Sequence, residues 1–233
     1  SLEKELGDVT NALREMSGLM SRSPQPPEWA LPKLDASHRA AGLLHISDIH
    51  AGEVVNANQI DGVNSYNLEI CQTRLRRLFG AAIEILPRWA RDCQLEGIIV
   101  AINGDLISGD IHEELLRTNA LAAIPSVWFV ADELAAGLAK LADVFGKVFA
   151  CVTPGNHGRT TAKMPSKETA NLSYDTAVGE ALRRHFINDD RVTIAVSPSR
   201  DALYSVFGWN ILQTHHDQGG GGAGFCGDLR ERG

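Results

Sequence analysis

The sequence has few cysteines, no long hydrophobic run and no surplus of positive charge. Its four cysteines form no CxxC pair and no zinc-ribbon spacing, which argues against a disulfide framework or a structural zinc site. No apolar run reaches the ~18 residues that a membrane span requires, and no signal peptide is recognisable. We therefore expect a cytoplasmic protein with reduced thiols and no membrane partner.

The length and net charge of the chain limit the size of its core and the kinds of partner it can bind. With 233 residues, of which 44% are hydrophobic, the chain can bury one substantial core. Its formal net charge of −7 gives no overall attraction for nucleic acid. Any polyanionic partner must therefore be held locally, for example by bound cations.

The N-terminal residues differ from the rest of the chain. Residues 2–20 carry an apolar residue at alternating intervals of four and three, which predicts an amphipathic heptad helix. This helix either packs on its own domain or joins copies of the chain into a homo-oligomer. Residues 21–32 contain four prolines and indicate a semi-rigid linker. We divide the chain into residues 1–35, helix and linker, and residues 36–233, the main domain.

Beyond the linker, apolar runs typical of buried strands alternate with helical periodicity. This alternation predicts an α/β fold with a largely parallel sheet and a hairpin late in the chain. The expected strands are residues 42–47, 97–103, 147–153, 191–197, 203–207 and 209–214, and the expected helices are 67–91, 111–118, 126–145 and 173–186.

Four short clusters of metal-ligand side chains follow the expected strands. The carboxyl ends of parallel strands meet at one edge of a sheet, where open α/β sheets bind their ligands. We therefore expect the clusters to converge. They are Asp48-Ile49-His50, Asn103-Gly104-Asp105, Gly155-Asn156-His157-Gly158 and His215-His216-Asp217.

The first two clusters offer a carboxylate each. Asp48 and His50 are two residues apart, so in extended chain their side chains project to the same side and can bind one ion together. Asp105 follows Gly104, which permits a sharp turn, and its two oxygens can bridge cations ~3.5–4 Å apart. An ordinary Asn-Gly-Asp turn is the alternative. The wholly apolar strand before Asn103 argues against it.

The last two clusters add neutral ligands. Asn156 can offer its carbonyl oxygen to a metal, whereas His157 can face the substrate and protonate a leaving alkoxide. His215 would complete the shell of a second ion, with Asp217 orienting an imidazole.

A charge count favours phosphate chemistry. Two divalent ions bring four positive charges and the two carboxylates bring two negative ones, so the site keeps about two positive charges for an anionic ester. Mixed oxygen and imidazole ligands suit manganese, our first choice, or iron, zinc, nickel or cobalt.

The order D-x-H, G-D, G-N-H-x and a strand-end H resembles the calcineurin-like metallophosphoesterase superfamily over residues 42–217. The resemblance implies a sandwich of two sheets flanked by helices, with a dinuclear centre at the sheet edge. By motif position it implies that Asp48 and His50 bind the first metal, Asp105 bridges, Asn156 and His215 bind the second metal, and His157 is catalytic.

Two departures from the family pattern stand out. The Gly-His-x-His motif that usually closes the family's metal site is absent, so we expect the phosphoesterase domain to be incomplete at its C-terminal end. The G-N-H motif usually continues with an acidic residue, whereas this chain has Gly158.

We therefore expect a metal-dependent phosphodiesterase, most simply one that acts on DNA or RNA like the family's exonucleases. Alternatives are a small-molecule phosphodiesterase, a protein phosphatase, or a non-catalytic scaffold with a degenerate metal site. Candidate substrate contacts are Arg159, His112 and His216, and a basic turn of Arg74, Arg76 and Arg77 either grips a polynucleotide or is a solvated helix face.

Overall fold

The computed structural model describes residues 25–30, 38–163, 165 and 167–215, together with Lys4, Gly7, Thr10 and Gly18. The residues of the predicted heptad stripe lie outside this part of the chain, as do His216, Asp217 and Cys226.

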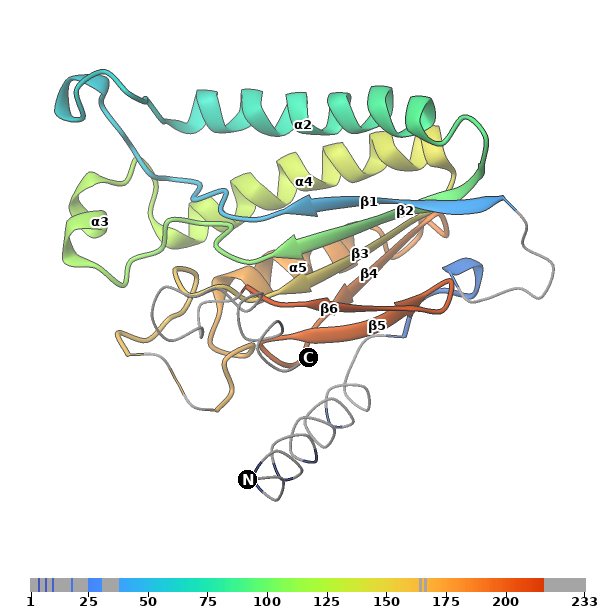
Figure 1. Ribbon diagram of the computed structural model, residues 1–233. Helices are drawn as coiled ribbons and strands as arrows, with labels where there is room; N and C mark the ends of the chain where they lie inside the picture. The colour runs from blue at the N-terminus through green and yellow to red at the C-terminus, as the bar shows by residue number, and fades with distance from the viewer. Residues whose placement is uncertain are drawn as a thin grey trace.

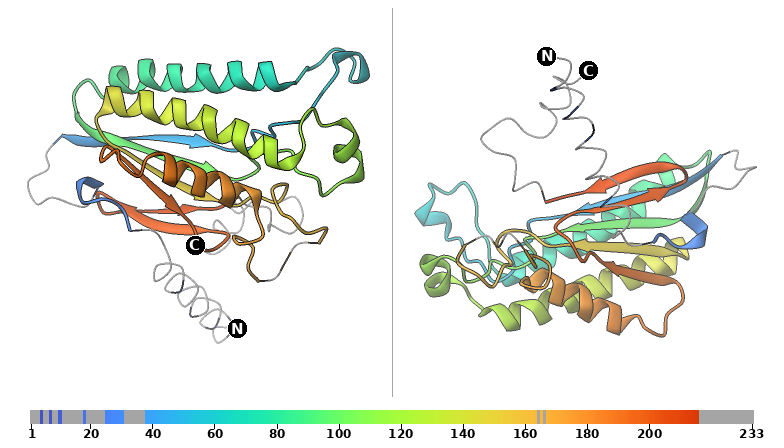
Figure 2. Two further views of the ribbon diagram at one scale, coloured as in Figure 1. Left: turned by 180° about the vertical axis from the view of Figure 1, so that it is seen from behind. Right: turned by 90° about the horizontal axis from the view of Figure 1, so that it is seen from below.

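A four-stranded parallel sheet in the order β1-β2-β3-β4 forms the centre of the fold (Figure 1). Its strands are β1 (Arg39–Ile46), β2 (Gln94–Asn103), β3 (Val148–Thr153) and β4 (Val192–Val196). Helices α2 (Leu68–Trp89), α4 (Ala123–Phe145) and α5 (Tyr174–His185) cover one face, and short α3 (Glu113–Thr118) lies beyond the carboxyl edge. The strands β5 (Ala202–Val206) and β6 (Trp209–Gln213) pair antiparallel and lie on the opposite face (Figure 2).

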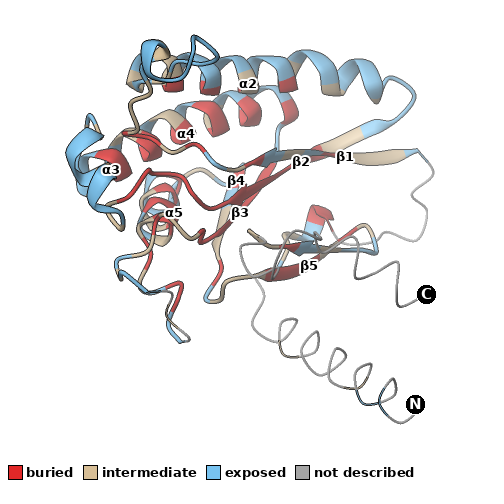
Figure 3. Ribbon diagram, turned by 60° about the vertical axis from the view of Figure 1, so that its left-hand side comes forward, coloured by how far each residue is buried: buried red, intermediate tan, exposed pale blue. Residues whose placement is uncertain are grey.

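The central strands are apolar throughout because both faces of the sheet are covered. On β2, Ile98, Val100 and Ile102 belong to the core beneath the helices, whereas Ile99 packs with Phe149 and the β5–β6 hairpin. Figure 3 shows β2 and β3 buried while the outer side of α2 is exposed. Burial on two faces explains why these strands read as continuous hydrophobic runs.

Side-chain caps fix where two of the helices begin. The Asn67 side chain accepts a hydrogen bond from the Ile70 N–H at 2.9 Å, and the Ser173 hydroxyl accepts one from the Asp175 N–H at 3.1 Å. Each cap satisfies a backbone donor that would otherwise lack a partner in the first helical turn. The Ser173 cap also sets the position of Asp175, whose carboxylate contacts the loops after β2 and β3.

Gln213 connects the hairpin to the central sheet. Its buried amide donates to the Ile102 carbonyl at 3.1 Å and to the Cys151 carbonyl at 2.9 Å, and its oxygen accepts from the Tyr204 hydroxyl at 3.1 Å. These bonds hold the end of β6 against the carboxyl ends of β2 and β3.

Part of the predicted linker belongs to the folded core. Residues Glu28–Ala30 form a 3-10 helix, and Trp29 and Ala30 are buried with β2, β3 and β5. The Phe207 N–H donates to the Ala30 carbonyl at 2.8 Å. The packing of the domain therefore includes residues ahead of position 36.

The structure confirms the predicted parallel α/β arrangement and its late hairpin, with element ends shifted by a few residues. Cys71, Cys93 and Cys151 form no disulfide with one another in the described part of the chain. Within the described part of the chain, no helix combines the length and apolar character that crossing a membrane requires.

Candidate metal centre

The loops after β1 and β2 stay paired beyond the ends of their strands. The Asp48 N–H donates to the Gly104 carbonyl at 3.2 Å, and the His50 N–H donates to the Asp105 carbonyl at 2.9 Å. A parallel bridge between Ala51 and Ile107 continues the pairing. The first two clusters are therefore held side by side by the backbone.

Unusual backbone angles accompany three of the predicted ligands. Asp48, His50 and Asp105 have φ angles of 55°, 48° and 50°, in the left-handed region that residues other than glycine rarely adopt. Each such residue costs on the order of 1–3 kcal/mol, and strain of this kind concentrates at functional sites. The three turns direct their side chains to the carboxyl edge of the sheet.

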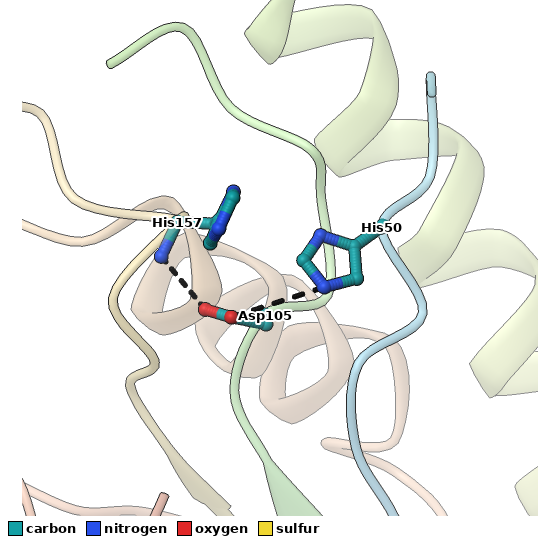
Figure 4. A group of neighbouring side chains, drawn as sticks. All are labelled: His50, Asp105 and His157. Atoms are coloured by element: carbon teal, nitrogen blue, oxygen red, sulfur yellow. Dashed lines mark hydrogen bonds and ion pairs between the residues drawn. The ribbon is translucent and has the colours of Figure 1, made fainter. Parts of the chain in front are cut away.

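Asp105 lies at the centre of the predicted ligands. Its carboxylate belongs to two groups whose ligand atoms all lie within 4.8 Å of one another, one formed with His50 and His157 and one with Asp48 and His215. Figure 4 shows the first group, with dashed lines from Asp105 to the His50 ring and to the His157 backbone. A carboxylate can bridge two cations. In Asp105, Oδ2 faces the rings of both His50 and His215, while Oδ1 accepts the His157 N–H.

His215 is oriented by the backbone of β2. Its Nδ1 lies 2.6 Å from the Asn103 carbonyl oxygen, which leaves Nε2 facing the Asp105 carboxylate at 3.1 Å and the Asn156 side-chain oxygen at 3.2 Å. A carbonyl that holds one ring nitrogen and leaves the other free is common behind metal-binding histidines. Asp217, the predicted orienting residue, lies outside the described residues.

The electrostatics of Asp105 and His215 reflect their contact. Burial raises the pKa of Asp105, but hydrogen bonds from the His215 ring and the His157 N–H outweigh it, and the net pKa is lowered. Burial lowers the pKa of His215, yet Asp105 and the Asn103 carbonyl raise it to about 9. Asp105 is thus an anion at neutral pH.

His157 is placed by three contacts. Its N–H donates to Asp105 at 2.7 Å, its Nδ1 lies 3.3 Å from the Ser108 carbonyl oxygen, and its ring packs edgewise on His50 with centroids 4.7 Å apart. If Nδ1 carries the proton that Ser108 accepts, Nε2 is left to face a ligand. The ring of His112, a predicted substrate contact, lies 5.7 Å from His157 between centroids.

The site opens to solvent on the side of the first cluster. The Asp48 side chain is 59% exposed, whereas those of Asp105 and His215 are 4% and 8% exposed. His50 Nδ1 is buried and has no hydrogen-bond partner among the described residues. Asp105 and His215 therefore lie at the buried base of the site, and an anionic substrate can approach from the exposed side beside Asp48.

The structure brings together Asp48, His50, Asp105, Asn156, His157 and His215. Arg159 has a different set of contacts, because its guanidinium donates to the carbonyls of Asn156, Thr161 and Ala162. These bonds shape the loop after His157, and a substrate contact by Arg159 stays a prediction. His216, also predicted to contact the substrate, lies outside the described residues.

Asp175 is a functional candidate that the sequence did not reveal. Its carboxylate is fully buried behind the site and accepts hydrogen bonds from the N–H groups of Gly155 at 2.8 Å, Leu106 at 3.0 Å and Asp105 at 3.2 Å. Burial raises its pKa to about 6, against the opposing effect of these donors. Asp175 therefore ties the loops after β2 and β3 together. A Ser-x-Asp at a helix start is too common to indicate this role.

Glycines allow these loops to approach so closely. A Cβ on Gly104, whose φ is +66°, would lie 2.1 Å from the Gly155 nitrogen. A Cβ on Gly158 would lie 2.6 Å from Asp175 Oδ2. The space beside Gly158 is therefore filled by a carboxylate that comes from α5 instead of from position 158 itself.

No model of a known protein family matches this chain, and no curated protein matches its sequence.

Proposed function

We propose that this protein is a metal-dependent phosphoester hydrolase with a dinuclear centre, acting on phosphodiesters of nucleic acid. The observation that carries the proposal is the position of Asp105, whose carboxylate is shared by two groups of potential ligands. The donor set of carboxylate, imidazole and amide oxygen, without thiolate, fits manganese and chemically similar divalent ions.

The two geometric groups place Asp48 with His215 and His50 with His157. The proposal follows the order of the motifs instead: Asp48, His50 and Asp105 hold the first ion, since His50 Nε2 lies 3.7 Å from Asp48 and 3.9 Å from Asp105, and Asp105, Asn156 and His215 hold the second. When bound, two such cations neutralise phosphate oxygens and lower the pKa of water. Asn103 fixes the His215 ring, and Asp175 fixes the backbone of both central loops. His157, held by Ser108 and Asp105, presents Nε2 to the oxygen that leaves phosphorus and, as an imidazolium with a proton on each ring nitrogen, can donate the Nε2 proton to it.

We infer further that the chain is a calcineurin-like metallophosphoesterase and that its two sheets are the two layers of that family's sandwich. The order of the four clusters supports this assignment, as does the hairpin on the sheet face opposite the helices. Assembly through an N-terminal helix and a cytoplasmic location stay predictions.

Metal-loaded protein tests the reaction directly. With manganese we expect hydrolysis of bis-p-nitrophenyl phosphate and of DNA, and little hydrolysis of p-nitrophenyl phosphate. Asp105→Asn should lower the diesterase rate at least ~100-fold and reduce the manganese bound per chain. Asp92→Asn, the same change at a side chain that is 93% exposed, is the matched control. Turnover of the monoester alone would refute the diesterase proposal.

A further inference from the structure

A pocket of about 490 Å³ opens beside the candidate metal centre, between β1 with its following loop and α2. Asp48 and His50 line it, so it adjoins the ligands of the first proposed ion. Its volume lies within the ~300–1,000 Å³ of typical small-ligand pockets. A group attached to a phosphate at the metals would therefore enter this space.

The walls of the pocket are mainly apolar. Val55, Leu75 and Leu78 contribute aliphatic surface, and Tyr66 contributes an aromatic ring. The Tyr66 hydroxyl donates to the Ile49 carbonyl, and this hydrogen bond fixes the ring beside the first cluster, Asp48-Ile49-His50. Such a surface favours a flat, largely apolar group and offers a phosphate alone little to bind.

The pocket also contains one guanidinium without an acidic partner. Arg74 lies 5.2 Å above the Tyr66 ring and donates to the Asn64 side chain at 3.1 Å. No ion pair links Arg74 to any acidic side chain in the described part of the chain. Arg76, two residues along α2, instead pairs with Glu133 at 3.4 Å. Of the three arginines of the basic turn, Arg74, Arg76 and Arg77, only Arg74 lines the pocket.

Glu53 adds a single carboxylate to the wall of the pocket. It offers acceptor oxygens, whereas Asn64 offers both a donor and an acceptor. The pocket thus combines apolar walls, hydrogen-bond donors and acceptors, the candidate metal ligands Asp48 and His50 at one end, and the Arg74 guanidinium, which forms no ion pair with the described acidic side chains. A nucleoside between two phosphates has the complementary features.

We propose that this pocket binds one nucleoside of the substrate, with the scissile phosphate at the metal centre and the next phosphate at Arg74. This inference rests on the proposed hydrolase function and adds where one nucleoside of the substrate binds and which residue recognises its second phosphate. A pocket of this size accepts a single unpaired nucleotide, so we expect chain ends or single strands to be preferred over the interior of a duplex.

Binding of small nucleotides by manganese-loaded protein, measured calorimetrically, tests the proposal. Thymidine 3′,5′-bisphosphate carries a phosphate on each side of one nucleoside, whereas thymidine 5′-monophosphate carries only one. We expect the bisphosphate to bind at least ~10-fold more tightly, and Arg74→Gln to abolish this difference. Arg77→Gln, on the same helix but outside the pocket lining, should preserve it.

Two controls separate the pocket from the reaction. Pyrophosphate that binds as tightly as the bisphosphate would overturn the proposal, because the apolar walls would then contribute nothing. If bis-p-nitrophenyl phosphate is hydrolysed but Arg74→Gln leaves bisphosphate binding unchanged, the pocket assignment is wrong and the hydrolase proposal stands. If no diester is hydrolysed but bisphosphate binding depends on Arg74, the pocket stands and the hydrolase proposal is wrong.

Discussion

Moving the buried carboxylate of Asp175 to position 158 would test how the central loops are held. The Asp175 carboxylate accepts three backbone N–H groups, and a Cβ on Gly158 points directly at it, 2.6 to 2.8 Å from its three carboxylate atoms. Gly158 does not have a positive φ, so its backbone accepts an aspartate. The double variant Gly158→Asp/Asp175→Ala should therefore return a carboxylate to nearly the same place.

The expected magnitudes depend on these contacts. Asp175→Ala leaves three buried donors without their acceptor, each worth about 1–3 kcal/mol, and relief of the buried charge offsets part of that loss. We expect a net loss of about 2–4 kcal/mol in the free energy of unfolding. Gly158→Asp alone should lose a similar amount through overlap and like-charge repulsion. The double variant should recover at least ~2 kcal/mol relative to the sum of the single variants.

Urea unfolding of metal-free protein measures these free energies, and calorimetric titration with manganese reports the state of the site. Gly158→Ala/Asp175→Ala is the matched control, since it relieves the overlap without restoring an acceptor. Manganese affinity should be weakened in Asp175→Ala and in this control, and restored in the aspartate exchange. Single-variant effects that simply add, within ~0.5 kcal/mol, would refute the reasoning.

Three further outcomes are expected. In metal-free protein the folded state raises the pKa of His215 to about 9. The protonated ring therefore stabilises the fold fully below pH 6.5, and this stabilisation is lost as the pH rises through 9. The free energies of unfolding measured in urea below pH 6.5 and above pH 9 should differ by about 3 kcal/mol, and His215→Gln should remove the difference. Gln213→Ala should lower the free energy of unfolding by about 2–4 kcal/mol, measured in urea, because buried partners in β2 and β3 lose their donor. Gly137→Ala should lower the melting temperature by several degrees, because its Cβ would lie 2.1 Å from Phe79 between α2 and α4.

The fold and the convergence of the clusters were accessible from the sequence because both arise from local patterns. Strands buried on two faces are apolar throughout, as in β2 and β3, and a parallel sheet places the residues after its strands at one edge. The polar residues that follow these strands, Asp48, Asp105 and His215, were therefore recognisable as candidate site residues.

The supporting contacts were not accessible because they depend on side chains that meet only in three dimensions. Asp175 resembles an ordinary residue of a first helical turn, and nothing local shows that it bonds to loops about 20 and 70 residues earlier in the chain. Arg159 was a candidate substrate contact, yet its guanidinium donates to carbonyls of its own loop. Trp29, within a proline-rich stretch, gave no sign that it is buried against the sheet.

The order in which the ligands emerge from the ribosome has a consequence for assembly. Asp48, His50 and Asp105 are synthesised early and lie in the loops after β1 and β2, whereas His215 reaches them only when the β5–β6 hairpin has docked on the opposite face of the sheet. Because N-terminal parts of a chain generally fold first, the candidate ligand group that contains His215 would be completed last. A nascent chain would therefore lack the complete group of candidate ligands until the hairpin docks on the sheet.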